Sequence, residues 1–359
     1  MTKKFYRNII FSKTPLTSFL RVGDHFQIYP CDFENAPKSR FCNDFPLAIE
    51  YWVDEDEKVE VSDDWEDLKE HFSKTSLQII KLNRLTSLLS SITNHRIFNY
   101  AEIEFRWGVP LPDKELNETE KQIVNNTPSQ AIFGIYTYPD MWKDLQIKEF
   151  SEQRHQSAKL ISHFFYYEND PFDDKTKEIT FPVTIHKLVE AYFNLNGKTL
   201  KIVNSITHLI CNGIDIKLKM KSLSFLSFVS SIETIVNYEL KDKNDEIEFD
   251  CPDCQAVNKS PLKCPKCDRP IWGVKAKFKA FLKAYVAGSA NSVKKFNRIY
   301  NLRSDIVHNG MLLLGDEQLD WAKSEKTDSQ YMIHIETMQL ARLSLVNWLL
   351  LGPNKILIE

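Results

Sequence analysis

The segment from Arg303 to Gly310, with the sequence RSDIVHNG, places a guanidinium and an imidazole in the last two turns of a predicted helix. Arg303 lies in the middle of an apolar stripe made of Phe296, Ile299, Tyr300, Ile306 and Val307. A guanidinium keeps its charge in proteins, and burying it without a partner is costly. Arg303 therefore requires a carboxylate, a subunit interface or a phosphate.

His308 lies about 140° around an ideal helix from Arg303, so the two side chains would flank a cleft. Asn309 and Gly310 predict the helix end, because glycine readily adopts the left-handed conformation. A helix C-terminus favours positive charge, and an imidazole can exchange a proton near neutral pH. An imidazole beside a permanent cation suits phosphate-ester chemistry. The structural alternative is a salt-bridged arginine followed by a capping histidine.

Two C-x2-C pairs predict a zinc site with the ligands Cys251, Cys254, Cys264 and Cys267. Each pair forms a tight turn, and four thiolates satisfy the tetrahedral geometry of Zn²⁺. Because such a set leaves no ligand position open, we expect a structural zinc and no catalytic metal. The other three cysteines show no pairing pattern, and we expect buried small hydrophobes in a reducing cytosol.

The region from Lys259 to Arg303 is strongly basic, although the whole chain has a net charge of −3. Within it, a predicted helix carries a lysine row at i, i+4 and i+8. The candidate RNA-binding residues are Lys275, Lys279, Lys283, Lys294, Lys295 and Arg298. A lysine row is often only a solvated helix face, but this one leads toward Arg303 and favours a surface that follows phosphates.

The composition indicates a protein with two well-packed domains, since 359 residues suffice for two cores and 12% of them are aromatic. The acidic net charge argues against a protein that coats nucleic acid indiscriminately. The first residues lack the long apolar run of a signal peptide, and the C-terminal apolar run is interrupted by Arg342 and Asn347. We therefore expect a cytoplasmic protein with no membrane contact.

The pattern of elements predicts an α+β fold. Strand signals lie at Asp24–Tyr29, Leu47–Val53, Ala101–Trp107 and Ala131–Tyr138, and helical spacing is found at Trp65–Ile92 and Gln146–Phe165. From Val183 onward we expect helices almost throughout, including Ser222–Leu240 and Gln330–Leu351, with breaks at Asn196-Gly197 and Asn212-Gly213. The predicted organisation is a mixed domain at 1–165, a linker at 166–182, and a helical domain at 183–352 that carries a zinc-binding insertion at 248–273.

Residues 183–352 resemble the HEPN superfamily, and within it the Apea-like HEPN group of abortive-infection proteins. The segment SFLSFVSSIETIVNYE, Ser224–Glu239, is similar to the first long helix of these domains, and IYNLRSDIVHNG is similar to their R-x4-H signature. Ser304 departs from the wider superfamily, in which the position after the arginine is often Asn, Asp or His. The cysteine pairs also fall between the two key helices.

The resemblance implies an all-α helical bundle that dimerises, or forms a higher even oligomer, and cleaves RNA without a catalytic metal. Arg303 and His308 would correspond to the catalytic pair, and Glu233 would orient Arg303. Independently of the resemblance, Ser304 lies on the same helix face as His308, four residues before it, and would position the imidazole or the phosphate. The resemblance implies an antiphage effector. Because an unrestrained ribonuclease would kill its host, we expect the N-terminal domain to provide the restraint and to sense a phage-derived trigger. A non-catalytic, zinc-stabilised scaffold that binds RNA or protein is the alternative, and the sequence leaves the RNA target open.

Overall fold

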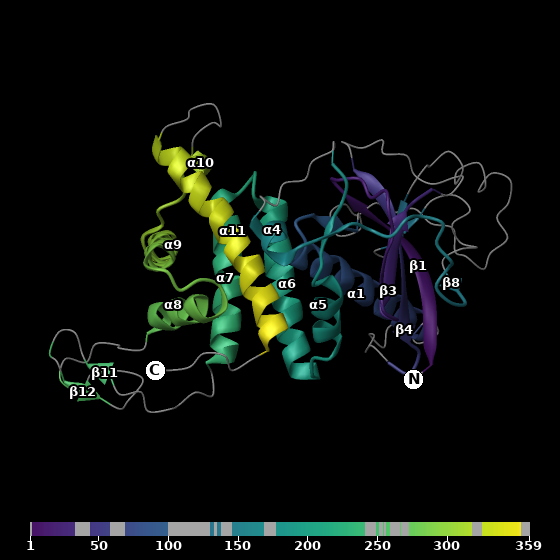
Figure 1. Ribbon diagram of the computed structural model, residues 1–359, viewed down its shortest axis with the longest axis horizontal. Helices are drawn as coiled ribbons and strands as arrows, with labels where there is room; N and C mark the ends of the chain where they lie inside the picture. The colour runs from purple at the N-terminus through teal and green to yellow at the C-terminus, as the bar shows by residue number, and fades with distance from the viewer. Residues whose placement is uncertain are drawn as a thin grey trace. The chain divides into compact units, whose positions relative to one another are not determined.

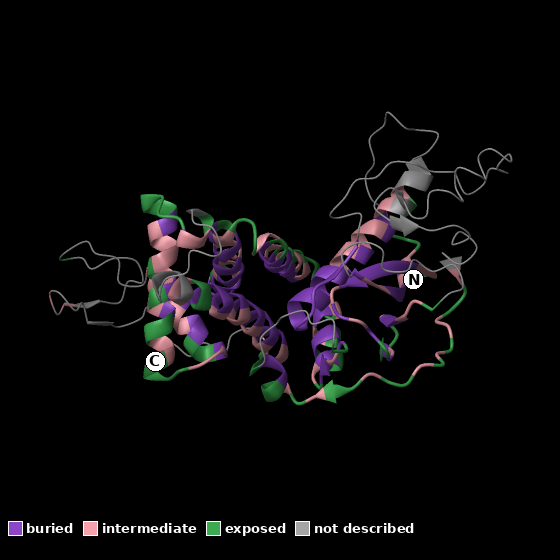
Figure 2. Ribbon diagram, turned by 90° about the horizontal axis from the view of Figure 1, so that it is seen from above, coloured by how far each residue is buried: buried purple, intermediate pink, exposed green. Residues whose placement is uncertain are grey.

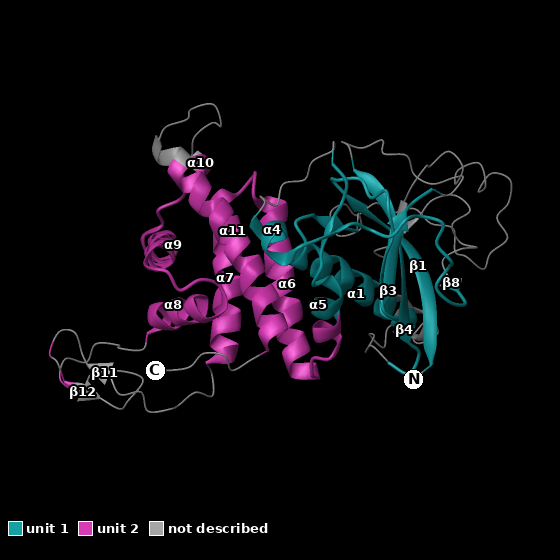
Figure 3. Ribbon diagram, viewed as in Figure 1, with its two compact units in different colours: residues 1–189 teal, residues 190–359 magenta. Residues whose placement is uncertain are grey.

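The computed structural model folds into two compact units, Met1–Val189 and Glu190–Glu359 (Figure 3). The first contains an antiparallel sheet and the second is mainly helical, so the fold is α+β as the sequence predicts. The residues that the structure describes are 2–32, 44–57, 69–99, 130–132, 135–137, 146–168, 177–240, 249–250, 254, 256–258, 266, 273–317 and 325–352.

The first unit is built on an antiparallel sheet with the order β2-β3-β4-β1-β5, in which β8 also pairs with β1 (Figure 1). Its two longest strands pair along their whole length, from Lys3 opposite Asp54 to Ser12 opposite Phe45. The strands are β1 (Lys3–Ser12), β2 (Leu20–Val22), β3 (Phe26–Pro30), β4 (Phe45–Asp54), β5 (Ile97–Phe98) and β8 (Gln146–Ile147).

One face of this sheet packs against helix α1 (Lys69–Ile92). The Tyr51 hydroxyl donates a hydrogen bond to the Gln78 carbonyl at 3.3 Å, and the Gln78 amide donates to the Asn8 side chain at 3.2 Å. Leu85, Leu88 and many other apolar residues of this unit are completely buried (Figure 2). Because strand side chains alternate between faces, Glu50 must lie on the opposite face from Tyr51.

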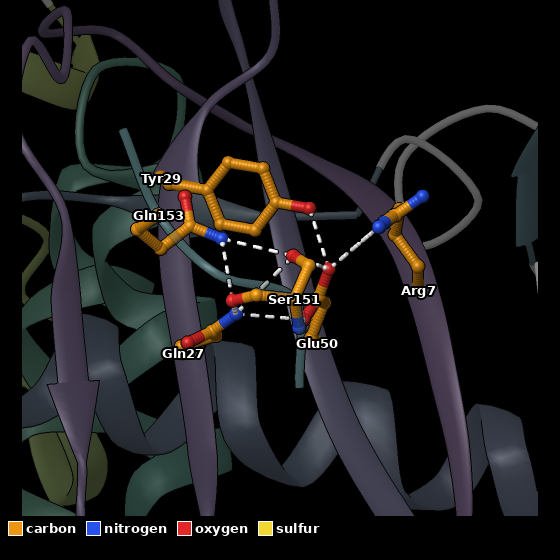
Figure 4. A network of polar contacts seen from close by, with 6 residues as sticks. All are labelled: Arg7, Gln27, Tyr29, Glu50, Ser151 and Gln153. Carbon is orange, nitrogen blue, oxygen red and sulfur yellow. Dashed lines mark hydrogen bonds and ion pairs between the residues drawn. The ribbon is translucent and has the colours of Figure 1, made fainter. Parts of the chain in front are cut away.

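On that second face, Glu50 is fully buried and surrounded by donors (Figure 4). Its carboxylate accepts hydrogen bonds from Arg7 Nε at 2.9 Å, the Tyr29 hydroxyl at 2.6 Å and the Gln27 amide at 2.7 Å. The backbone N–H and hydroxyl of Ser151 add bonds of 2.8 and 2.6 Å. Burial alone would raise the pKa of Glu50, but the bonds from Ser151 and Tyr29 and the Arg7 charge lower it below its ordinary value.

The contact of Ser151 with Glu50 fixes an extended segment over the sheet. The sequence predicted a helix at Gln146–Phe165, and this prediction is wrong. This range contains β8, β9 (Leu160–Ile161) and only the start of α4 (His163–Glu168). The extended chain lets the Phe19 N–H bond to the Gln156 carbonyl and the Ala158 N–H to the Phe19 carbonyl. The apolar spacing of the segment therefore serves contacts with the sheet rather than a helix face.

Some of the other predictions for this unit are confirmed and others are not. Strands β3 and β4 lie where the sequence placed them, whereas β1 had no predicted counterpart. The predicted strand Ala131–Tyr138 is two short strands, β6 (Gln130–Ile132) and β7 (Ile135–Thr137), and Ala101–Trp107 lies outside the described residues. The range predicted as a linker contributes buried residues to this unit, including Tyr166 and Tyr167. Their hydroxyls donate hydrogen bonds to the backbone carbonyls of Thr180 and Ile92. In the same range, β10 (Phe181–Pro182) pairs with β9.

The second unit is a helical bundle in which α7 packs against α6 and α11 (Figure 1). Its core is aromatic and aliphatic, with Phe225, Phe228, Phe281 and Trp348 almost completely buried. Figure 1 shows α9 nearly end on, so this helix crosses the bundle helices. The helices are α5 (Ile185–Phe193, which spans the unit boundary), α6 (Gly197–Ile216), α7 (Lys221–Glu239), α8 (Val274–Tyr285), α9 (Ala290–Asn309), α10 (Leu314–Glu317) and α11 (Glu325–Leu351).

Gly213 does not break a helix, contrary to the sequence prediction, because α6 continues through it to Ile216. A Cβ atom at this position would lie 2.6 Å from Cε1 of Phe228, so the glycine allows α6 and α7 to pack closely. Ser224 strengthens the same contact by donating its hydroxyl to the Gly213 carbonyl at 2.6 Å. The other predicted break is confirmed, since Asn196 caps the start of α6 and its side chain accepts the Thr199 N–H.

The predicted zinc-binding insertion lies largely outside the described residues. Two short strands within it, β11 (Phe249–Asp250) and β12 (Val257–Asn258), pair antiparallel. Within the described ranges, no cluster of three or more His, Cys, Asp or Glu side chains is placed to hold a metal. No helix in those ranges is both long and apolar enough to cross a membrane.

Candidate active site at the end of α9

The local sequence places His308 in the last turn of α9, as predicted. At the start of the helix, the Ser289 hydroxyl accepts the Ser292 N–H at 3.2 Å. At its end, Gly310 adopts the left-handed conformation with φ 65°, and the Asp305 carbonyl accepts the N–H groups of Gly310 and Met311. This arrangement satisfies carbonyls at the helix end and fixes where His308 leaves the backbone.

The predicted pairing of Arg303 with Glu233 of α7 is present. The Nε and Nη2 atoms of Arg303 lie 3.3 Å from Oε1 and Oε2 of Glu233, and only the Nη2 contact has the geometry of a hydrogen bond. The side chains are 23% and 13% exposed. Charge-assisted bonds of this kind are usually about 2.7–2.9 Å long, so the pair is loose. No described residue bonds to Nη1 of Arg303, which leaves that amino group available to a ligand.

Tyr300 adjoins this pair and was predicted only as an apolar position. The Arg303 guanidinium carbon lies 5.9 Å from the centre of the Tyr300 ring, which also packs against Phe278 at 5.4 Å. Burial and the nearby Glu233 carboxylate raise the pKa of the Tyr300 hydroxyl, and Arg303 opposes that change. Its position one turn before Arg303 is the signal that identifies it, because residues three apart on a helix are neighbours.

His308 and Ser304 do not meet Arg303 in this chain. His308 is exposed and Ser304 is half-buried, on the side of α9 that turns away from α7. Within the described part of the chain, no hydrogen bond joins Ser304 to His308 or either residue to Arg303. One copy therefore brings together Arg303, Glu233 and Tyr300, and presents His308 separately to the solvent.

The segment after His308 is held firmly by α7. The Asp316 carboxylate accepts the backbone N–H groups of Lys221 at 2.6 Å and Ser222 at 2.7 Å. Since the N-cap residue Met220 forms no side-chain cap bond, Asp316 supplies the cap of α7 from a distant part of the sequence. The Ser222 hydroxyl in turn accepts the Leu313 N–H at 2.7 Å. These contacts limit how far the last turn of α9 can move.

The predicted RNA-binding residues fall into different environments. Lys295 forms an ion pair with Glu336 of α11 at 2.7 Å, and Arg298 bonds to the Ser329 hydroxyl of the same helix. Lys275 instead reaches α9, where its ammonium donates to the Asn301 side chain at 2.7 Å. Lys283 and Lys294 are exposed, and Lys279 is half-buried. The structure thus separates cations that face α11 from cations on the remaining surface of α8 and α9.

Of the predicted zinc ligands, only Cys254 belongs to the described residues. It is half-buried and lies in the chain between β11 and β12. Cys251, Cys264 and Cys267 lie outside the described ranges. Thiolates in two C-x2-C pairs remain the donor set that a structural Zn²⁺ prefers, and β11 and β12 bracket the first pair.

The arrangement at the end of α9 can bind a phosphate and exchange a proton. Arg303 offers a fixed positive charge with one uncommitted amino group, and His308 offers an accessible imidazole on the same helix. Because Arg303 and His308 lie apart in one copy, either a substrate must bridge them or a second copy must supply a histidine near Arg303. Comparisons of the chain with models of protein families, with curated proteins and with solved structures found no match.

Proposed function

We propose that this protein is a metal-independent endoribonuclease of the HEPN type and acts as an antiphage, abortive-infection effector. The observation that carries the proposal is the Arg303–Glu233 pair. Glu233 holds one edge of the guanidinium and leaves Nη1 without a described partner, five residues before an exposed histidine. A purely structural arginine would be expected to use more of its donors within the protein.

The proposed reaction is attack of a ribose 2′-hydroxyl on the adjacent phosphorus. The new P–O2′ bond replaces the P–O5′ bond, so the products carry a 2′,3′-cyclic phosphate and a 5′-hydroxyl. One histidine accepts the 2′-hydroxyl proton and an acid donates a proton to the departing 5′ oxygen. Arg303 stabilises the charge that develops on the phosphorane. Positioned acids and bases contribute roughly 10²–10⁴-fold, and a preorganised charge contributes a comparable factor.

A homodimer would complete this site. His308 faces away from Arg303 within one copy, so a second copy can supply the other histidine as the acid. Large apolar side chains adjoin His308 and are about half exposed, namely Val307 at 47%, Met311 at 59% and Leu312 at 49%. Exposed apolar residues beside a polar site are suited to burial between subunits. Two copies would place two Arg303/His308 pairs at one groove.

The remaining regions have supporting roles in the proposal. The four cysteines would hold a structural Zn²⁺ that braces the insertion between α7 and α8. The first unit would respond to a phage-derived trigger and restrain the ribonuclease, because an unrestrained activity would damage the host cell. No described residue of that unit is assigned to catalysis.

The second candidate is a non-catalytic scaffold that binds RNA or protein. The separation of His308 from Arg303 within one copy favours it, because the residues can be explained individually as a solvent-exposed helix end and a salt bridge. The two candidates differ in one measurable property. Only the ribonuclease loses a chemical activity when the imidazole is removed from an otherwise folded protein.

The deciding experiment incubates total cellular RNA with the purified full chain and with His308→Ala in a chelator. The chelator exposure should be brief, and circular dichroism and zinc analysis should accompany it, because removal of structural zinc could unfold the protein. We expect cleavage by the wild type, and a loss of at least about 10²-fold in the variant, with unchanged helical content.

Equal cleavage by both proteins would show that His308 is not the site. Absence of cleavage by either protein, repeated in extracts from infected cells that contain a trigger, would favour the scaffold. Arg303→Lys serves as a second variant, because lysine keeps the charge but loses the planar pair of donors toward Glu233. Its cleavage rate should also fall while folding persists.

A further inference from the structure

The outer surface of α9 carries a regular row of polar residues that runs to His308. Lys294, Asn301 and His308 are separated by seven residues each, so they lie within about 40° of one another around an ideal helix. All three are exposed. At 1.5 Å per residue, the row from Lys294 to His308 is about 21 Å long.

Lys275 joins the middle of this row from a different helix. Its ammonium lies 2.7 Å from the Asn301 carboxamide oxygen, so the N-terminal end of α8 meets α9 two turns before His308. The partner is a neutral amide rather than a carboxylate. The positive charge of Lys275 is therefore not neutralised by this contact and remains available to an anion.

Two other cations of α9 contact α11. Lys295 follows Lys294 directly in the sequence, yet it forms an ion pair with Glu336 of α11, and Arg298 bonds to Ser329 of the same helix. Among the described residues, Lys294 forms no ion pair. Two adjacent lysines thus differ in their surroundings, which provides a matched comparison within the chain.

The charge of the two helices favours an anionic strand. Together α8 and α9 contain eight Lys and Arg residues and a single acidic residue, Asp305, in a chain whose net charge is −3. Asp305 accepts a bond from the Asn309 side chain at 3.3 Å. It lies within about 20° of Lys294 around the helix, so it is the one acidic group of the two helices that the row passes. A row of cations and amides on a convex helix can follow the phosphates of one strand, since single strands are bound by basic tracks of this kind.

We propose that single-stranded RNA lies along the outer face of α9, with its phosphates held by Lys294 and by Lys275 beside Asn301, and with one end of the track at His308. Lys295, whose charge is paired with Glu336, belongs to the contact with α11 and not to this track. The identity of the strand as the substrate rests on the proposed ribonuclease function, whereas the binding track does not depend on cleavage.

The test measures binding of a fluorescein-labelled, single-stranded 12-nucleotide RNA by anisotropy across a series of salt concentrations. The full chain carries His308→Ala so that cleavage does not alter the probe. Lys294→Ala and Lys275→Ala are compared with the matched variant Lys295→Ala, and circular dichroism verifies that each is folded. Loss of one phosphate contact should weaken binding about fourfold at 0.15 M salt and reduce the salt slope by about 0.7.

The expected result is this loss in the first two variants and a change of less than about twofold in the matched variant Lys295→Ala. Equal weakening by Lys294→Ala and Lys295→Ala would overturn the track, as would the absence of RNA binding at low salt. If the RNA binds along the track but the wild-type protein cleaves no RNA, even in extracts from infected cells, the proposed ribonuclease function fails and the binding site stands. If cleavage depends on His308 while the three lysine variants bind RNA equally, the track is wrong and the proposed ribonuclease function stands.

Discussion

Each unit contains a glutamate paired with an arginine, and the two pairs differ in how completely their polar groups are used. Glu50 is fully buried and accepts bonds from Arg7, Tyr29, Gln27 and Ser151. Glu233 contacts Arg303 at 3.3 Å, and its Oε1 atom is buried without a hydrogen bond of good geometry. The first carboxylate is saturated by its own protein, and the second is not.

The difference separates two uses of the same chemistry. A saturated buried pair organises the fold, because three other parts of the chain must be in place to satisfy Glu50. A loose, partly exposed pair can exchange part of its protein contacts for a ligand at low cost. The comparison therefore assigns Glu50 to the architecture of the sheet and supports the proposed role of Glu233 in orienting Arg303.

The largest expected effect comes from removing each carboxylate. Glu50→Ala leaves the buried donors of Arg7, Tyr29 and Gln27 without an acceptor, and it should lower the free energy of unfolding by about 3–5 kcal/mol. Glu233→Ala should cost only about 1 kcal/mol, because Arg303 can turn toward water. Urea unfolding followed by circular dichroism measures both values. RNA cleavage should fall about 10²-fold in Glu233→Ala, because Arg303 is no longer oriented.

The conservative variants Glu50→Gln and Glu233→Gln serve as controls, since each keeps the shape and one acceptor of the carboxylate. Equal losses of stability in the two alanine variants would show that saturation does not distinguish the pairs. A Glu233→Ala protein that cleaves RNA at the wild-type rate would remove Glu233 from the site.

Acid should distinguish the two units through His334 of α11. Ser224 donates its hydroxyl to the Gly213 carbonyl, so it accepts a bond from Nε2 of a neutral His334 at 2.8 Å. Burial lowers the pKa of His334 to about 4, Asp316 opposes this change, and Lys217 and Lys221 add to it. Because the unfolded imidazole titrates near 6.5, the stability contribution is complete above that pH and is lost as the pH falls toward 4.

The expected loss is about 2 kcal/mol between pH 7 and pH 5 and about 3 kcal/mol by pH 4. Glu50 has a lowered pKa, so its stabilisation of the sheet is lost only below about pH 4.5. Urea unfolding of wild type and His334→Gln at pH 7 and pH 5 measures the difference. The stability gap between the two proteins should narrow at pH 5, and an unchanged gap would contradict a neutral buried His334.

The sequence was most informative where a local pattern decides the structure. Gly310 ends α9 because glycine adopts a positive φ there, and the apolar stripe of α7 places Glu233 where it meets Arg303. Asn196 was recognised as a helix boundary for the same reason, since its side chain caps α6 within three residues. The α+β class follows from the different periodicities of the two halves.

The sequence was least informative where a residue depends on partners far along the chain. Glu50 looks like an ordinary exposed position of a strand, because the residues that bury it come from β1, β3 and the Ser151 segment. Gly213 was interpreted as a break because the ring of Phe228, which requires the glycine, lies on another helix. The roles of Arg303 and His308 remain predictions, since the pairing with Glu233 concerns only their positions.

The smallest expected effect concerns the loop that keeps His308 in place. Asp316→Ala removes the only side-chain cap described at the start of α7, which should lower the free energy of unfolding by about 1 kcal/mol. Asp316→Asn retains an acceptor oxygen and should cost about half as much. For thermal unfolding of the second unit, Glu190–Glu359, we expect shifts of about 2–4 °C and 1–2 °C. If the cap limits the motion of the last turn of α9, RNA cleavage should fall more in Asp316→Ala than in Asp316→Asn. An Asp316→Ala protein that is destabilised but fully active would show that the site of Arg303 and His308 tolerates movement around it.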